Sequence, residues 1–340
     1  MKSSSIALAV RLLLLLLLLP LLPLSGSTRD TITLTFAGDV LLDRGVRRVI
    51  EASNKTAGDT NGKTTGGTND KTSGELDGLF TSAIDSLFRE SQVVVANLEC
   101  PATKIKAPVF KRFIFRGEPE WLPALRTHGI THLNLANNHA IDQGRDGLMD
   151  TRQNILRAGM TPVGAGSTMA EAARPVLLAE GVGERGRRVW LLASVRLMLE
   201  NFAYLEDRPC VSQEPMDTLL RRVALLRRDD PTAVIIVSLH WGGEHTLKPV
   251  PAQRLDAHRL VDAGADALIC HHTHTLQTVE TYHGRPIYYS IGNFIFDQQQ
   301  PLNSRACLVQ LTVTDDSVTA KTIPIDIRRC VPSPATAQTD

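Results

Sequence analysis

Residues 267–274, with the sequence ALICHHTH, join a short apolar run to three histidines. The run at 267–270 predicts a buried strand, so the histidines begin the loop that follows it. Imidazole is the commonest protein ligand for metal ions, and alternate residues of an extended backbone point the same way. We therefore expect His272 and His274 to face one ion and His271 to face elsewhere. The alternative is a solvated polar loop, although three histidines in four residues are unusual for a loop without a task.

Polar clusters also end other strands that the sequence predicts. They are Asp39 with Asp43, Asn97 with Glu99, residues 137–139 with Asp142, and residues 240–245. Ligands of layered α/β proteins bind outside the carboxyl ends of strands, so clusters far apart in sequence can converge there. Their mixture of carboxylate, amide and imidazole groups suits a divalent cation. Taken singly, each cluster has a simpler interpretation as a turn, a local hydrogen bond or a buried core histidine.

The hydrophobic periodicity predicts strands that alternate with helices, followed by a β-rich C-terminal part. This pattern is typical of an α/β, or layered α+β, domain, which we place at residues 31–326. Residues 53–74 form a Gly/Thr/Asn/Lys tract that cannot bury a core, so they predict a disordered low-complexity insertion. The C-terminal residues 331–340 are predicted to be a disordered tail.

The composition limits the class of protein. The chain has 340 residues, of which 43% are hydrophobic, and a formal net charge of +1, which argues against a nucleic-acid binder. Residues 1–27 combine basic residues, an apolar run at 12–24 and small residues at 25–27. This segment predicts a secretory signal that is either cleaved or retained as a membrane anchor. We therefore expect an exported protein located in the periplasm, outside the cell or at its surface.

The chain has five cysteines, an odd number that leaves at least one of them unpaired in an exported protein. A chain this long and poor in cysteine does not predict a disulfide framework. Cys270 lies in an apolar strand pattern and is expected to be a small buried hydrophobic residue.

Five stretches together resemble a known family. The order of an Asp, an Asn-His pair, a strand-end His and a His-x-His is similar to that of calcineurin-like metallophosphatases. Within that superfamily the local sequences resemble the CapA group of bacterial capsule, or poly-γ-glutamate, synthesis proteins with a PGA_cap domain. The stretches are FAGDVLLDRGV, VVANLECPAT, HLNLANNHAIDQG, SLHWGGEH and HHTHTLQTVETYHGRPIYYSIGNFIFDQ, and they span about residues 34–297. The resemblance implies an αββα sandwich of two central mixed sheets flanked by helices.

The resemblance also implies roles for single residues. The metal ligands it implies are Asp39, Glu99, Asn138, His240, His272 and His274, with Glu99 in the region of the bridging carboxylate. His139 would assist the leaving group, oriented by Asp142. Substrate contacts are expected from Asn97, Arg116, Glu244 and Asn293. Leu41 stands where the superfamily has a histidine, so the resemblance leaves open whether one or two ions of manganese, zinc or iron are bound.

These expectations favour an exported metal-dependent, phosphoesterase-like hydrolase of capsule or poly-γ-glutamate biosynthesis. The alternatives are a non-catalytic scaffold or export factor of a capsule synthesis complex, and a hydrolase of γ-glutamyl amide bonds. The expected partners are an anionic polymer or phosphoester substrate and a membrane-bound capsule synthesis complex, without nucleic acid. A basic stretch that includes Lys104, Lys111 and Arg116 either faces such a substrate or forms a solvated loop.

Overall fold

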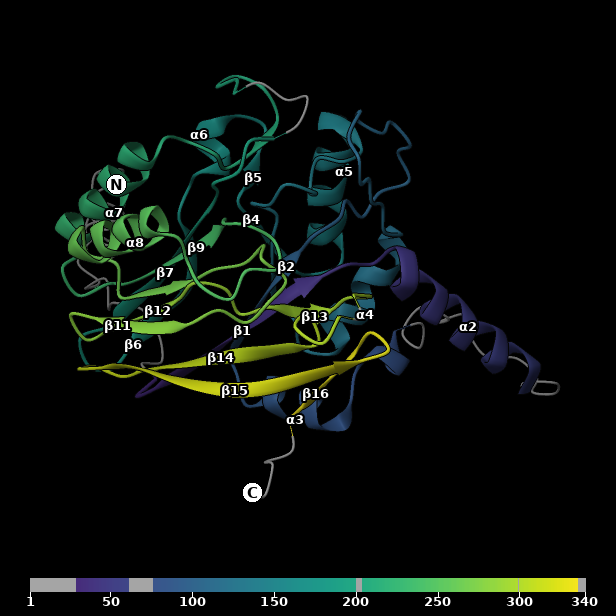
Figure 1. The fold of residues 1–340 in the computed structure, drawn as a ribbon. Helices are drawn as coiled ribbons and strands as arrows, with labels where there is room; N and C mark the ends of the chain where they lie inside the picture. The colour runs from purple at the N-terminus through teal and green to yellow at the C-terminus, as the bar shows by residue number, and fades with distance from the viewer. Residues whose placement is uncertain (1–28, 61–75, 200–203, 299, 336–340) are drawn as a thin grey trace, which may run out of the picture.

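Two mixed β-sheets form the centre of the computed structural model, which describes residues 29–60, 76–199, 204–298 and 300–335 (Figure 1). The first sheet has eight strands in the order β16-β15-β14-β1-β2-β3-β4, and β13 also pairs with β1. β1 runs parallel to β2 and β13 and antiparallel to β14. The strands are β1 (Ile32–Val40), β2 (Val93–Leu98), β3 (His132–Asn134), β4 (Thr161–Val163), β13 (Asn293–Ile295), β14 (Arg305–Val313), β15 (Val318–Arg328) and β16 (Val331–Pro334).

The second sheet has six strands in the order β11-β12-β10-β9-β7-β6. Its central strands β7, β9, β10 and β12 are parallel, and β6 and β11 pair antiparallel at the two edges. The strands are β6 (Val176–Val182), β7 (Arg187–Val195), β9 (Val234–His240), β10 (Ala267–Ile269), β11 (Val279–Tyr282) and β12 (Arg285–Tyr288). A separate two-stranded ribbon joins β5 (Ala165–Gly166) and β8 (Cys210–Val211).

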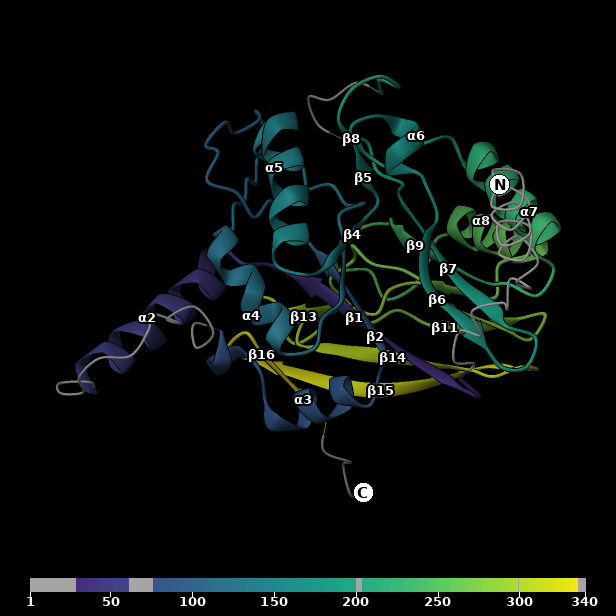
Figure 2. The same ribbon diagram turned by 180° about the vertical axis from the view of Figure 1, so that it is seen from behind.

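Helices cover the outer faces of both sheets. Figures 1 and 2 show α3 beneath the eight-stranded sheet, and α7 and α8 over the six-stranded sheet on the opposite side of the molecule. The helices are α2 (Arg44–Thr60), α3 (Ser82–Arg89), α4 (Leu122–Thr127), α5 (Gly144–Arg157), α6 (Met169–Ala172), α7 (Met216–Asp229) and α8 (Pro251–Asp262), with 3₁₀ turns η1 (Asp77–Leu79) and η2 (Pro119–Trp121). The predicted αββα sandwich of two mixed sheets is therefore confirmed.

Alternation along the strands builds the layers. In β1, Leu34 and Phe36 face the core between the sheets, which they share with Ile236 of β9. Ile235 and Val237, on either side of Ile236, point to the outer face of the sheet and pack against α7 and α8. Because successive side chains of a strand lie on opposite faces, a strand that is apolar on both faces is buried between two layers.

Two predicted boundaries differ from the structure. Helix α2 continues to Thr60 and so includes the first residues of the tract at 53–74, because a helix anchored by packed first turns extends at little cost. Residues 331–334, predicted to be disordered, form β16, because they pair with β15 at the edge of the sheet. Residues 61–74, the predicted signal segment 1–27 and residues 336–340 lie outside the described residues.

All five cysteines are buried and free, and the sequence did not predict a disulfide framework. Cys270 is fully buried, as its apolar surroundings predicted. Within the ranges that the structure describes, no helix has the length and apolar character that crossing a membrane requires.

Candidate metal centre

The carboxyl ends of strands from both sheets converge on one buried polar cluster. β1, β2 and β3 of the eight-stranded sheet contribute Asp39, Glu99 and residues 137–139. β9 and β10 of the six-stranded sheet contribute His240 and residues 271–274, and a bridge between His240 and His271 continues their parallel pairing. The strand-end clusters that the sequence singled out are thus brought together where ligands of layered α/β proteins bind.

The position of Asp39 depends on a close approach between β1 and β13. A Cβ atom on Gly38 would lie 2.1 Å from the carbonyl oxygen of Gly292, so only glycine fits there. The register of β1 against β2 shifts between Ala37 and Asp39, and the Asp39 amide donates to the Gly292 carbonyl. Asp39 consequently points into the cluster and is fully buried.

The histidine run differs from the prediction in two ways. His271 was expected to face elsewhere, but its Nδ1 lies 3.2 Å from Asp39 Oδ1. His272 and His274 have φ values of 95° and 55°, so the backbone is not extended and simple alternation does not apply. Left-handed backbone at residues other than glycine costs on the order of 1–3 kcal/mol each and is concentrated at functional sites.

His272 and His274 also belong to two different groups rather than to one ion. Ligand atoms of Glu99, His240 and His272 all lie within 4.8 Å of one another, and so do those of Asp39, Glu99 and His274. Glu99 belongs to both groups. The structure therefore contains two adjacent candidate cation positions with a shared carboxylate.

The first position is a cluster of lone-pair atoms. His240 Nε2 lies 2.8 Å from Asn138 Oδ1, 3.1 Å from His272 Nδ1 and 3.7 Å from Glu99 Oε1. Burial and the neighbouring His272 lower the pKa of His240 well below its usual value. Burial, together with His274, lowers the pKa of His272 to about 3. Both rings are therefore neutral at pH 7, which is the form of imidazole that binds metals.

The second position contains two carboxylates and one imidazole. His274 Nδ1 lies 2.9 Å from Asn293 Oδ1 and 3.4 Å from Asp39 Oδ2, and its Nε2 lies 3.7 Å from Glu99 Oε1. Burial opposes protonation of His274, but Glu99 and Asp39 raise its pKa to about 9. Burial would also raise the pKa of Asp39, yet the neighbouring imidazoles of His271 and His274 hold it well below its usual range. Burial and the charge of Asp39 raise the pKa of Glu99 well above its usual value.

The polar atoms left without partners test whether these residues fit a cation. Asp39 Oδ2 is buried and has no hydrogen-bond partner among the described residues, and the same holds for both carboxylate oxygens of Glu99. Buried polar atoms are nearly always partnered, so these exceptions need an explanation. A divalent cation supplies one, because carboxylate, amide oxygen and imidazole together suit manganese, iron or zinc.

His139 lies beside these two groups and belongs to a separate chain of hydrogen bonds. Its Nδ1 lies 2.8 Å from Asp142 Oδ2 and donates to it, so in the neutral ring Nε2 is the nitrogen that carries the lone pair. Burial lowers the pKa of His139 even though Asp142 opposes this effect. Lys111, whose side chain is 7% exposed, donates to Asp142 Oδ1 at 2.8 Å and to the carbonyl of Asn138. The sequence placed Lys111 only in a basic stretch, so its role in holding Asp142 was missed.

The residues expected to contact substrate have different surroundings. Asn97 donates to Asp39 Oδ1 at 2.9 Å and Asn293 accepts from His274, so both support the cluster from within. Glu244 is exposed next to His245 and acts electrostatically on Glu99. The Arg116 guanidinium donates to Glu118 and to the Thr103 carbonyl, and no hydrogen bond or ion pair joins it to the cluster within the described residues.

Comparison with known proteins identifies the family. The model of the family described as bacterial capsule synthesis protein PGA_cap matches residues 33–298. The PGA biosynthesis protein CapA of Bacillus subtilis is 28% identical over 90% of this chain and 74% of its own length. The capsule biosynthesis protein CapA of Bacillus anthracis is 28% identical over 94% of this chain and 73% of its own length.

A third relative covers less of the chain. The protein of Mycobacterium tuberculosis named "Probable polyglutamine synthesis accessory protein" is 31% identical over 64% of this chain and 61% of its own length. The family match covers β1 to β13 and includes every residue of the cluster described above. The chain therefore belongs to the PGA_cap family of bacterial capsule synthesis proteins, the CapA family.

Proposed function

We propose that this protein acts in the biosynthesis of a capsule or poly-γ-glutamate surface polymer as an exported metal-dependent hydrolase. The names of the two Bacillus relatives support the role in polymer biosynthesis, since they are described as PGA and capsule biosynthesis proteins. The observation that carries the hydrolase proposal is Glu99, a fully buried carboxylate with two unpartnered oxygens between two sets of ligand atoms.

The residues that would hold metal are those of the two groups. His240, His272 and Asn138 would complete one position, Asp39 and His274 the other, and Glu99 would belong to both. Manganese, zinc and iron each suit this donor set. When bound, such an ion would polarise the attacked group and lower the pKa of its bound water to about 7.

The protein's own groups would then orient the substrate and move the proton. Asp142 fixes the His139 ring so that Nε2 is free to accept or return a proton, and Lys111 holds Asp142 in turn. A positioned proton donor or acceptor of this kind contributes about 10²- to 10⁴-fold to a rate. In this proposal the substrate is an anionic polymer or a phosphoester, and the protein works at the cell surface with a membrane-bound synthesis complex.

The test measures turnover and metal content in the same samples. Purified protein loaded with manganese, zinc or iron is incubated with poly-γ-glutamate and, separately, with phosphomonoester and phosphodiester substrates. His139→Ala should keep its metal but lose about 10²-fold or more in rate. His258→Ala is the matched control, because His258 pairs with Glu280 on the outer part of the molecule.

Each outcome separates the candidates. Products from poly-γ-glutamate indicate hydrolysis of γ-glutamyl amide bonds, and products from the esters indicate a phosphoesterase. Polymer binding by the loaded protein without turnover of any substrate would contradict the hydrolase proposal and favour a scaffold or export factor.

A further inference from the structure

The first residue of α2, Arg44, places a cation beside the candidate metal centre. Its Cζ lies 4.9 Å from the centre of the Phe115 ring and 5.6 Å from that of Phe296. Phe115 packs on His139 with ring centres 4.2 Å apart, and Phe296 packs on His274 at 4.7 Å. The guanidinium is thus separated from each of these two histidines by a single aromatic ring.

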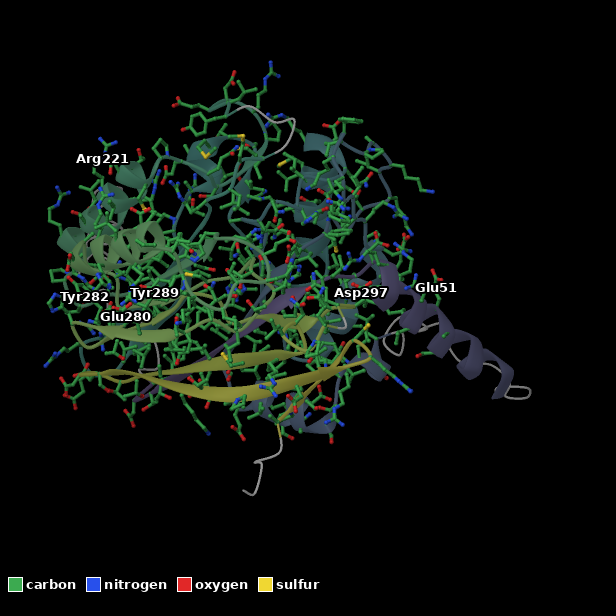
Figure 3. All side chains as sticks on the ribbon, in the orientation of Figure 1. Glu51, Arg221, Glu280, Tyr282, Tyr289 and Asp297 are labelled. Carbon is green, nitrogen blue, oxygen red and sulfur yellow. The ribbon has the colours of Figure 1, made fainter. Side chains whose placement is uncertain are left out.

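Arg44 is held firmly, yet part of its hydrogen-bonding capacity is unused. Its Nη2 pairs with Asp297, and the other oxygen of Asp297 accepts from the Gly45 amide at 2.9 Å. Figure 3 shows Asp297 close to the first turn of α2. Arg44 Nε is buried and has no hydrogen-bond partner among the described residues. A buried guanidinium donor without an acceptor is costly, so a ligand oxygen is the natural partner.

The backbone at Arg44 supports the same interpretation. Its φ is 51°, in the left-handed region that residues other than glycine rarely adopt. Such strain persists where the surrounding structure imposes it, and it is concentrated at ligand sites. Here it aims the side chain back over Phe115 and Phe296 instead of away from the cluster.

A cavity of about 410 Å³ adjoins the Arg44–Asp297 pair. Its walls are Phe296, Asp297, Gln298, Ser304, Ile327, Arg329 and Cys330. Arg329 is exposed and also has a φ of 51°. Arg44 and Arg48 both act electrostatically on Cys330 in the cavity wall. The cavity wall therefore contains an arginine, Arg329, and an acidic residue, Asp297, whose charge Arg44 balances.

We propose that Arg44 and this cavity form a subsite for an oxyanion group of the substrate, a carboxylate or a phosphate, next to the reacting centre. A guanidinium presents several donors in a fixed plane, which matches the geometry of both anions. Arg329 would bind a second anionic group of the same substrate polymer, so the subsite suits a polyanion. This inference rests on the proposed function, because it names the substrate class of the same site.

The test measures binding rather than turnover. Fluorescently labelled oligo-γ-glutamate and, separately, labelled oligophosphate are titrated into the full-length protein, and bound metal is determined in each preparation. The variants are Arg44→Gln, Arg44→Lys and Arg329→Gln. Arg221→Gln is the matched control, because Arg221 lies on α7, away from Asp297 (Figure 3). Thermal unfolding verifies that each variant is folded, and Arg329→Gln decides the result if Arg44→Gln does not fold.

We expect Arg44→Gln to weaken one of the two oligomers about tenfold with metal content unchanged, and Arg44→Lys to weaken it less. Loss for oligo-γ-glutamate alone assigns the subsite to carboxylates, and loss for oligophosphate alone assigns it to phosphates. Unchanged affinity for both oligomers in the Arg44 and Arg329 variants would overturn the subsite. Tenfold weaker binding in a protein that never shows turnover would sink the hydrolase proposal but leave the subsite standing.

Discussion

Buried carboxylates occur at both ends of strand β10, in opposite conditions. At the amino end Asp266 is 3% exposed, and it accepts from the Ile235 amide at 2.9 Å and pairs with Arg227 and with Arg285. Near the carboxyl end Glu99 is fully buried, and neither of its oxygens has a hydrogen-bond partner in the described residues. The fold supplies its own cations for Asp266, whereas Glu99 has His274 nearby and lies at the position proposed for a metal ion. In this proposal Asp266 is a structural charge and Glu99 is a charge that awaits a ligand.

Adding metal should produce the largest effect, and only at the carboxyl end. Manganese, zinc or iron at about 1,000 times its dissociation constant should stabilise the folded protein by about 4 kcal/mol, because the ion binds the native state alone. Thermal unfolding with and without metal measures the gain. A His240→Ala/His272→Ala double variant should lose much of it, and an equal gain in that variant would contradict the assignment of ligands.

Removing the compensated carboxylate should destabilise the protein. Asp266→Asn should lower the free energy of unfolding by about 3 kcal/mol, because it leaves Arg227 and the Ile235 amide with weakened partners. Urea denaturation measures the change. Asp256→Asn is the control, since the pair of Asp256 with Arg259 is largely solvated and should contribute little. A loss for Asp266→Asn no larger than that of the control would show that its partners contribute little.

His132 is a third kind of buried titratable side chain, because burial keeps it in its neutral form. Burial lowers the pKa of His132 to about 4, whereas an unfolded histidine titrates near 6.5. The unfolded state therefore takes up the proton first, so stability is complete above pH 6.5 and is lost as the pH falls toward 4. At pH 5 the loss should reach about 2 kcal/mol.

Comparing the wild type with His132→Asn isolates this contribution, because the titration of the other histidines is common to both proteins. The measurement is the free energy of unfolding in urea at pH 7 and pH 5. Equal pH dependence in the two proteins would show that His132 takes up its proton at its usual pKa in the folded state.

Glu99→Gln should have the smallest effect on the free energy of unfolding, opposite in sign to that of Asp266→Asn. In metal-free protein at neutral pH, Glu99→Gln should raise the free energy of unfolding by about 1 kcal/mol, because burial and the charge of Asp39 disfavour the charged form of Glu99 more than His274 favours it. Chemical denaturation in the presence of a chelator measures it. Destabilisation of the size seen for Asp266→Asn would mean that the fold itself depends on the Glu99 charge.

The hydrophobic pattern predicted a layered α/β domain, and the family resemblance implied the αββα sandwich. The convergence of the polar strand ends was predicted because apolar runs mark buried strands and parallel strands end at a common edge. Asp39, Glu99, His240 and the histidine run were found in this way. The direction of His271 was predicted wrongly, because the positive φ values of His272 and His274 follow from tertiary contacts that an alternating pattern does not contain.

Other features depended on partners distant in sequence. Arg44 stands 253 residues before Asp297, and Lys111 is 31 residues before Asp142, so neither pair leaves a local pattern. Strand β16 was missed because two of its four residues are prolines, which strands tolerate only at an edge. Arg116 was expected to contact substrate, and the structure pairs its guanidinium with Glu118; the substrate contact itself stays a prediction.

If Glu99 is shared by two cation positions, the metal stoichiometry of the protein depends on it more than on either histidine. Elemental analysis is performed on the loaded wild type, His272→Ala, His274→Ala and Glu99→Gln, after equal exposure to metal and removal of free ions. Each histidine variant should lose metal from one position, and Glu99→Gln should lose it from both. Glu99→Gln that retains the wild-type metal content would contradict the claim.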